Sequence, residues 1–265
     1  MAENHTQQKH FVLVHGLGHG AWCWYKLIPL LECAGHKVTV VDLAGAGINL
    51  KEIGRDVLTF HEYTEPLLKI LASLPPNEKV ILVGHSLGGM SLSLAMDTFP
   101  DKISVAVFIT ALMADTIHKP SYVIDQYLES VPEEQFLDTE FIPSGTPEHP
   151  LTLTILGPTY LSSNLYQLSP IEDLELAKTL LRPGSFFQQD LSKAKKFTNE
   201  GYGSVTRVFV VCDEDRTINI KFQCWMIENN PPKDVLEVRG ADHMAMLSKP
   251  HEVFNRLLEI ANKYA

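Results

Sequence analysis

The stretch Lys79-Val80-Ile81-Leu82-Val83-Gly84-His85-Ser86-Leu87-Gly88 decides which fold the chain can adopt. Its apolar, β-branched first half predicts a buried strand, and the apolar pattern over 89–99 predicts a helix directly after it. The residues between them fit G-x-S-x-G, in which a sharp strand-to-helix turn strains the central serine's backbone. Such a turn lifts the Ser86 hydroxyl clear of the sheet and directs the N–H of Leu87 at whatever Ser86 attacks. The alternative is a glycine-rich turn with a buried capping serine, because the bare pattern also occurs by chance.

Apolar strand patterns recur on both sides of this turn and alternate with helical patterns. Alternation of this kind implies an α/β fold, with a mostly parallel sheet of about six strands and helices on both faces. The 265 residues are enough for a single domain, 1–265, with a sizeable core. Further strands are expected at 10–14, 37–41, 103–109, 206–211 and 235–238, and further helices at 22–33, 60–74, 221–228 and 252–264.

The alternation stops between residues 111 and 188, where prolines and aromatic residues replace clean strand patterns. Ligands of parallel α/β sheets bind at the carboxyl ends of the strands, so we predict that 111–188 is a cap insertion over that edge. Its apolar residues form either a small core within the insertion or the roof of a pocket. They are Tyr122, Tyr127, Phe136, Phe141, Leu153, Leu156, Tyr160, Leu161 and Tyr166.

Charge and composition exclude several classes of partner. The chain carries 22 basic and 32 acidic residues, a formal net charge of −10, which disfavours nucleic acid and anionic membrane surfaces as partners. The segment 1–10 is polar without the apolar core of a secretion signal, and no apolar run approaches the ~20 residues of a membrane helix. The four cysteines lack C-x-x-C spacing, so we expect free thiols, no metal site and a cytoplasmic location.

A serine hydroxyl is a weak nucleophile and needs a positioned base. With Ser86 on a strand-to-helix turn, a carboxylate and then a histidine should follow in later loops. His243 comes after the last expected strand, and Asp213, Glu214 and Asp215 come after the strand before it. The spacing does not choose among the three carboxylates. The alternative role for His243 is a loop histidine that caps the last helix or pairs with its neighbour Asp242.

The loop His15-Gly16-Leu17-Gly18-His19-Gly20 follows the first strand and is expected to supply a second N–H donor to the substrate oxygen. Its glycines superficially resemble a dinucleotide-binding turn. However, the third glycine comes one position too early for G-x-G-x-x-G. His15 and His85 flank the site and are expected to hydrogen-bond to nearby backbone.

Stretches from one end of the chain to the other resemble the plant methylesterase and hydroxynitrile lyase branch of the α/β-hydrolases. The resemblance implies an α/β-hydrolase fold whose sheet begins at the strand carrying His-Gly, and a reaction without cofactor or metal. Members that cleave an indole-alkaloid methyl ester, whose acid then loses carbon dioxide, look most similar, and salicylate- and jasmonate-type methylesterases look nearly as similar. The stretches are KHFVLVHG, AWCWYKLIPLLECAGHKVTVVDLA, VILVGHSLGGMSLSLAMDTFPDKISVAVF, EDLELAK, RPGSFFQQDLSKAKKF and GADHMAML.

The resemblance also implies a role for individual residues. It places the nucleophile on Ser86, the acid on Asp215 and the base on His243. The N–H groups of Leu17 and Leu87 become the expected oxyanion donors.

The same resemblance separates two chemistries. The lyases carry Thr and Lys at the positions of Gly16 and Met244, where a hydroxyl holds the cyanohydrin and a cation stabilises departing cyanide. Neither residue of this chain can do so, which favours ester hydrolysis. Phe136 stands where the salicylate type carries Trp. The residues expected to line the substrate pocket are Gly16, His85, Tyr127, Phe136 and Met244.

The sequence therefore predicts a cytoplasmic serine carboxylesterase that cleaves a small plant-metabolite methyl ester through an acyl-enzyme on Ser86. Its expected partner is the small-molecule ester, and a homodimer is an open alternative to a monomer. The rival functions are a hydroxynitrile lyase on the same fold and a small-molecule receptor with vestigial turnover.

Overall fold

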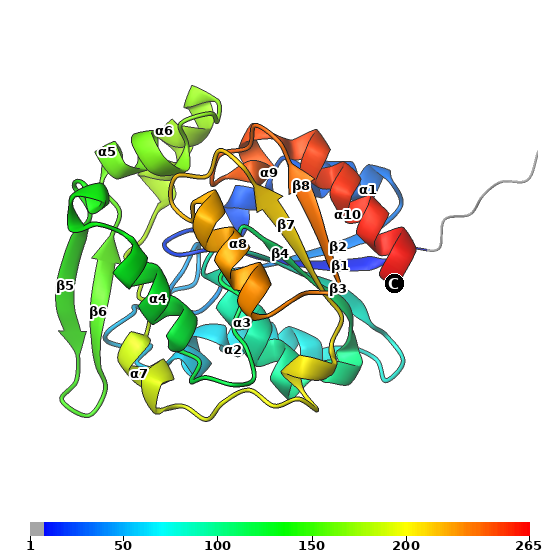
Figure 1. The fold of residues 1–265 in the computed structure, drawn as a ribbon, viewed down its shortest axis with the longest axis horizontal. Coiled ribbons are helices and arrows are strands. Elements are labelled where there is room, and N and C mark those ends of the chain that lie inside the picture. The colour runs from blue at the N-terminus through cyan, green and yellow to red at the C-terminus, as the bar shows by residue number, and fades with distance from the viewer. Residues whose placement is uncertain (1–7) are drawn as a thin grey trace, which may run out of the picture.

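A six-stranded sheet forms the centre of the computed structural model, which describes residues 8–265 (Figure 1). The strand order is β2-β1-β3-β4-β7-β8, and every neighbouring pair is parallel, so the predicted α/β fold is confirmed. Most of the polar segment 1–10 lies outside the described residues. The strands are β1 (His10–Val14), β2 (Lys37–Val41), β3 (Val80–His85), β4 (Ile103–Ile109), β7 (Arg207–Cys212) and β8 (Asp234–Val238).

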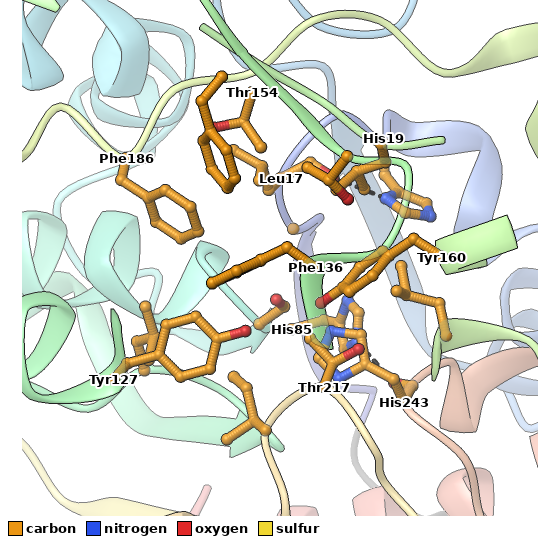
Figure 2. Close-up of a pocket in the computed structure, with 18 residues that line it drawn as sticks. Leu17, His19, His85, Tyr127, Phe136, Thr154, Tyr160, Phe186, Thr217 and His243 are labelled. Carbon is orange, nitrogen blue, oxygen red and sulfur yellow. Dashed lines mark hydrogen bonds between the residues drawn. The ribbon is translucent and has the colours of Figure 1, made fainter. Parts of the chain in front are cut away.

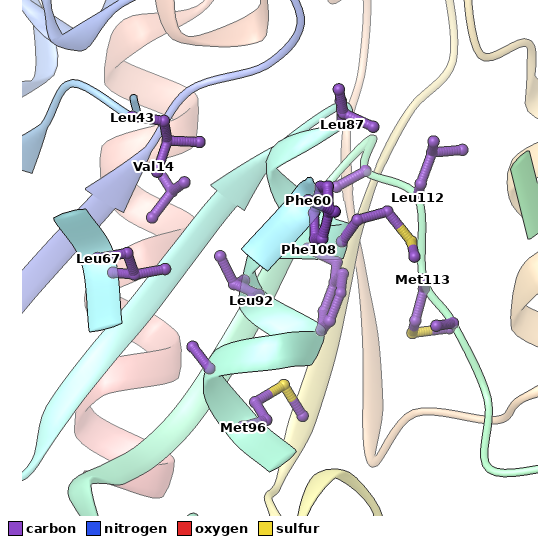
Figure 3. Packing of buried hydrophobic residues seen from close by; sticks show 14 of the residues in the cluster. Val14, Leu43, Phe60, Leu67, Leu87, Leu92, Met96, Phe108, Leu112 and Met113 are labelled. Atoms are coloured by element: carbon purple, nitrogen blue, oxygen red, sulfur yellow. The ribbon is translucent and has the colours of Figure 1, made fainter. Parts of the chain in front are cut away.

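Helices cover both faces of the sheet, because successive strand side chains point to opposite sides. On one face, Val14 and Phe108 pack in the same cluster as Leu67 and Leu92 of the covering helices (Figure 3). On the other face the strand side chains pack against the first and last helices of the chain. The first face carries α2 (Phe60–Ser73), α3 (Gly88–Thr98) and α8 (Ile220–Asn229), and the second carries α1 (Leu27–Cys33), α9 (Ala245–Ser248) and α10 (Pro250–Tyr264).

The helix expected over 22–33 is divided into two pieces, which corrects the prediction. A 3-10 turn, η1, spans Ala21–Trp24, and α1 begins only at Leu27. Pro29 explains the break, since its ring would clash with the carbonyl of Tyr25 four residues earlier in a continuous helix. In the observed arrangement Pro29 occupies the first turn of α1, where its missing N–H costs nothing.

The segment 111–188 contains short helices, and it also contains an antiparallel hairpin that the sequence analysis did not expect. β5 (Glu140–Gly145) pairs with β6 (Pro150–Ile155), and Pro143 lies opposite Thr152. A two-stranded sheet consists only of edge strands, so it tolerates a proline that would mark a central strand as broken. The expectation of no strand here was therefore wrong. The other elements are α4 (Tyr122–Ser130), η3 (Glu133–Phe136), α5 (Pro158–Tyr160), η4 (Leu161–Leu165) and α6 (Ile171–Leu180), followed by α7 (Gln188–Lys193) and η5 (Tyr202–Ser204).

The hairpin of β5 and β6 and helix α4 lie beside the sheet, to its left in Figure 1. Arg182, just after α6, fixes the facing loop by donating to the backbone carbonyls of Gly47 and Lys51. Lys26 and Tyr25 both bind the buried Asp173 of α6, at 2.5 and 2.6 Å. The inserted segment is thus tied to the sheet domain by buried and half-buried polar contacts as well as by apolar packing.

Candidate active site

The turn between β3 and α3 holds Ser86 in a strained conformation. Its φ angle is +55°, in the left-handed region that residues other than glycine rarely adopt. Gly88 is required beside it, because a side chain there would bring a Cβ within 2.6 Å of the carbonyl oxygen of His15. The strained turn predicted from G-x-S-x-G is therefore present, and Ser86 is 9% exposed at its tip.

A buried carboxylate and imidazole lie at the same edge of the sheet as this serine, and the imidazole lines the same cavity. The Nδ1 atom of His243 lies 2.7 Å from Oδ2 of Asp215, and both side chains are at most 2% exposed. The other carboxylate oxygen, Oδ1, accepts the N–H groups of Thr217 at 2.7 Å and Ile218 at 2.9 Å. Because Nδ1 donates to a carboxylate, Nε2 of His243 is left as the acceptor nitrogen.

The structure decides between the three carboxylates that spacing left open. Asp213 accepts the N–H of Gly240 at 2.6 Å, and Glu214 is exposed. Asp215 alone of the three contacts His243. The alternative pairing of His243 with Asp242 is wrong, because that carboxylate is taken up by the N–H of Leu168 and the hydroxyl of Ser169, and by the N–H of Met244.

A cavity opens at the carboxyl edge of the sheet and is lined by both Ser86 and His243 (Figure 2). Loops after five strands and residues of the inserted segment form its wall, and none of these lining residues is Lys, Arg, Asp or Glu. Four of the five residues predicted to line a pocket do so. They are Gly16, His85, Tyr127 and Phe136.

Residues 11–257 of the chain match the alpha/beta hydrolase family. The chain belongs to this family. It is 55% identical to salicylic acid-binding protein 2 of Nicotiana tabacum, over 97% of this chain and 98% of that protein. Methylesterase 3 of Arabidopsis thaliana is 52% identical over 100% of both chains. The crystal structure of polyneuridine aldehyde esterase gives a TM-score of 0.94 at 54% identity and covers 96% of this chain and 100% of that one.

These comparisons confirm the resemblance to plant methylesterases. Within the described residues of this α/β-hydrolase, no helix combines the length and apolar composition needed to cross a bilayer. Cys23, Cys33, Cys212 and Cys224 are all free thiols, as their spacing predicted.

Met244 is the predicted pocket residue that the structure places elsewhere. Its side chain is fully buried in the cluster on the α1–α10 face, and it is not among the residues lining the cavity. Its N–H donates to Oδ1 of Asp242, which fixes the chain directly after His243. The residue after the histidine therefore turns away from the cavity into the core, which corrects the prediction for Met244.

The two predicted oxyanion donors lie in suitable places. Leu87 is the N-cap residue of α3, and the first N–H groups of a helix have no partner within the helix. Leu17 lines the cavity in the loop after β1. His15 fixes that loop as predicted: its Nδ1 donates to the carbonyl of Gly16 at 2.8 Å, and its Nε2 accepts the N–H of Leu43 at 3.1 Å.

The sequence analysis did not anticipate Thr110, which lies at the carboxyl end of β4. Its hydroxyl donates to Oδ2 of Asp215 at 2.5 Å, the same oxygen that binds His243. Its φ angle is +36°, a second strained residue beside the site. The position of Thr110 in the sequence could have indicated its role, because a polar residue at the carboxyl end of a parallel strand lies at the edge of the sheet where ligands bind.

His85 links the nucleophile's turn to the histidine loop. Its Nε2 donates to the carbonyl of His243 at 2.7 Å, as expected for a histidine that binds backbone. Burial lowers the pKa of His85 well below its usual value, so the ring is neutral and its Nδ1 carries no proton. Nδ1 has no hydrogen-bond partner among residues 8–265.

Proposed function

We propose that this α/β-hydrolase is a carboxylic methyl ester hydrolase that works through an acyl-enzyme on Ser86. The observation that carries the proposal is the contact of His243 with the buried Asp215, in a cavity that the strained Ser86 also lines. A nucleophile, a base and a carboxylate that orients the base are the parts that acyl transfer requires.

In the first half of the proposed reaction, the Ser86 hydroxyl attacks the ester carbonyl while Nε2 of His243 removes its proton. The N–H groups of Leu87 and Leu17 stabilise the oxyanion that forms. When the carbon–oxygen bond to the alcohol breaks, His243 returns the proton and methanol leaves. Asp215 stabilises the imidazolium throughout and keeps its Nδ1 proton in place.

In the second half, a water molecule attacks the acyl-enzyme with His243 again acting as the base. The tetrahedral intermediate releases the free acid, and the proton returns to Ser86. No lysine or arginine lines the cavity to pair with the product carboxylate, which favours its release.

We propose small plant-metabolite methyl esters as the substrates, with three candidates. These are an indole-alkaloid aldehyde ester, whose acid loses carbon dioxide after hydrolysis, methyl salicylate and methyl jasmonate. The first two follow from relatives named polyneuridine aldehyde esterase and salicylic acid-binding protein 2. We further propose that residues 1–265 form one functional unit, in which the segment 111–188 covers the active site. A cytoplasmic location is in keeping with the free thiols.

Purified protein incubated with a panel of methyl esters tests the proposal. We expect methanol and free acid in equal amounts, and no turnover by Ser86→Ala. A small-molecule receptor would bind the esters without releasing methanol, and that result would contradict the proposal. Mandelonitrile cleavage by the wild type would indicate the lyase, which Gly16 and the buried Met244 disfavour.

Sedimentation velocity of the same sample distinguishes monomer from homodimer.

A further inference from the structure

Two tyrosines of the inserted segment line the cavity with almost fully buried rings. Tyr127 of α4 is 4% exposed and Tyr160 of α5 is 5% exposed. Figure 2 shows their hydroxyls pointing from opposite sides toward the middle of the cavity. Phenylalanine would provide the same apolar surface, and a buried hydroxyl without a partner costs about 1–3 kcal/mol. The two hydroxyls therefore need an explanation beyond apolar lining.

Two other buried tyrosines of this chain have a fixed hydrogen-bond partner. The hydroxyl of Tyr166 lies 2.7 Å from Nε2 of His19, and that of Tyr202 donates to the backbone carbonyl of Ala114. Such bonds tie the hydroxyl to the protein and leave it little capacity for a ligand. The two cavity tyrosines differ, because among the described residues neither hydroxyl has a backbone or charged side-chain partner.

We call the three hydroxyl groups of Tyr127, Tyr160 and Thr217 the hydroxyl cluster. The hydroxyl of Tyr160 interacts with those of both Tyr127 and Thr217. Thr217 donates its own proton to the carbonyl of Asn164, at 3.2 Å. Within the described residues neither tyrosine hydroxyl is held by a backbone or charged group, so a phenol proton can turn to a ligand.

Both tyrosines keep their protons at neutral pH. Burial raises the pKa of Tyr127 well above its usual value, and burial also raises that of Tyr160. A neutral phenol can donate one hydrogen bond and accept another. The hydroxyl cluster can therefore bind either a carbonyl oxygen or a hydroxyl group.

The hydroxyl cluster lies beside the reaction centre. The N–H of Thr217 donates to Oδ1 of Asp215 at 2.7 Å, and both tyrosines line the cavity that Ser86 and His243 line. The leaving group of a methyl ester has a single carbon, so the remainder of the cavity must hold the acyl part. The cluster therefore faces the acyl part.

We propose that the hydroxyl cluster is a subsite that hydrogen-bonds an oxygen function, carbonyl or hydroxyl, on the acyl part of the substrate. The inference rests on the proposed function and makes the substrate the methyl ester of an oxygenated acid. A site built to hydrogen-bond a substrate oxygen discriminates against the analogue that lacks it, because the hydrogen bonds between the cluster and the ligand are then lost.

A matched set of substrates tests this. Methyl hexanoate is compared with its 3-, 4- and 5-oxo derivatives and with the corresponding hydroxy esters. We expect the wild type to hydrolyse the best oxygenated ester with a kcat/KM about tenfold or more above that of methyl hexanoate. Tyr127→Phe and Tyr160→Phe should reduce this preference to less than about threefold, chiefly by lowering kcat/KM for the oxygenated ester.

Tyr63→Phe is the matched control, because Tyr63 is a buried tyrosine of α2 that does not line the cavity. It should keep the full preference for the oxygenated ester. An equal kcat/KM for all esters in the wild type would overturn the inference, as would an undiminished preference in both cavity variants. If the wild type hydrolysed no methyl ester, the proposed function itself would fail, and this result is distinguishable from the others.

Discussion

Gly16 lies so close to the nucleophile that adding one methyl group should disable the enzyme. A Cβ at this position would lie 2.7 Å from Cβ of Ser86 and 3.2 Å from both its Oγ and Nδ1 of His85. Carbon atoms in contact prefer about 3.5–4.0 Å, so Gly16→Ala requires a displacement of roughly 0.8 Å or more.

The displacement must fall on the reacting groups. Ser86 cannot retreat freely, since its φ angle is already +55° and Gly88 behind it packs closely against the carbonyl of His15. Either the serine oxygen or the loop that carries the N–H of Leu17 must therefore move. Misplacing a reacting group by about 1 Å can cost about 100-fold in rate, which corresponds to roughly 2.7 kcal/mol in the activation barrier.

We therefore expect Gly16→Ala to lower kcat/KM for a chromogenic ester by about 100-fold. Overpacking of this kind costs about 1–3 kcal/mol of stability, so the variant should still fold, with a lower Tm in thermal unfolding. Gly203→Ala is the control, because a Cβ there would lie 3.4 Å from its nearest neighbour, the side chain of Asn199. Gly16→Ala with more than a third of wild-type activity would refute the reasoning.

Three further predictions follow from the site. Ser86→Ala should lower kcat/KM by about 10³-fold or more while circular dichroism is unchanged, and retained turnover would contradict the mechanism. Asp215→Asn should reduce kcat far more than Asp213→Asn, because only the former carboxylate contacts His243, and the reverse order would contradict this assignment. Burial lowers the pKa of His19 to about 3, so below pH ~6.5 the unfolded chain binds a proton that the folded chain does not. The free energy of unfolding in urea should therefore fall as pH drops from about 6.5, by up to about 1.4 kcal/mol per pH unit from this histidine, and His19→Gln should show a smaller decrease.

The sequence by itself determined the sheet and the serine turn, because both depend on local patterns. Buried parallel strands require continuous apolar, β-branched runs, so all six strands lie within two residues of their predicted positions. The turn at Ser86 depends on glycines that no other residue can replace, such as Gly88 against the carbonyl of His15. The order of serine, carboxylate and histidine along the chain followed from the same alternation of strand and helix.

Only the tertiary structure decided which neighbouring side chains face the site. Spacing along the chain does not distinguish Asp213, Glu214 and Asp215. Asp215 differs because its carboxylate accepts two backbone N–H groups from the following turn and the hydroxyl of Thr110, which follows another strand. Met244 follows His243 directly, yet its side chain turns into the core. The hydroxyl cluster joins residues far apart in the chain, so no local pattern could indicate it. Periodicity reports the state of the backbone, whereas the direction of a loop side chain depends on contacts with distant segments, and these exist only once the chain has folded.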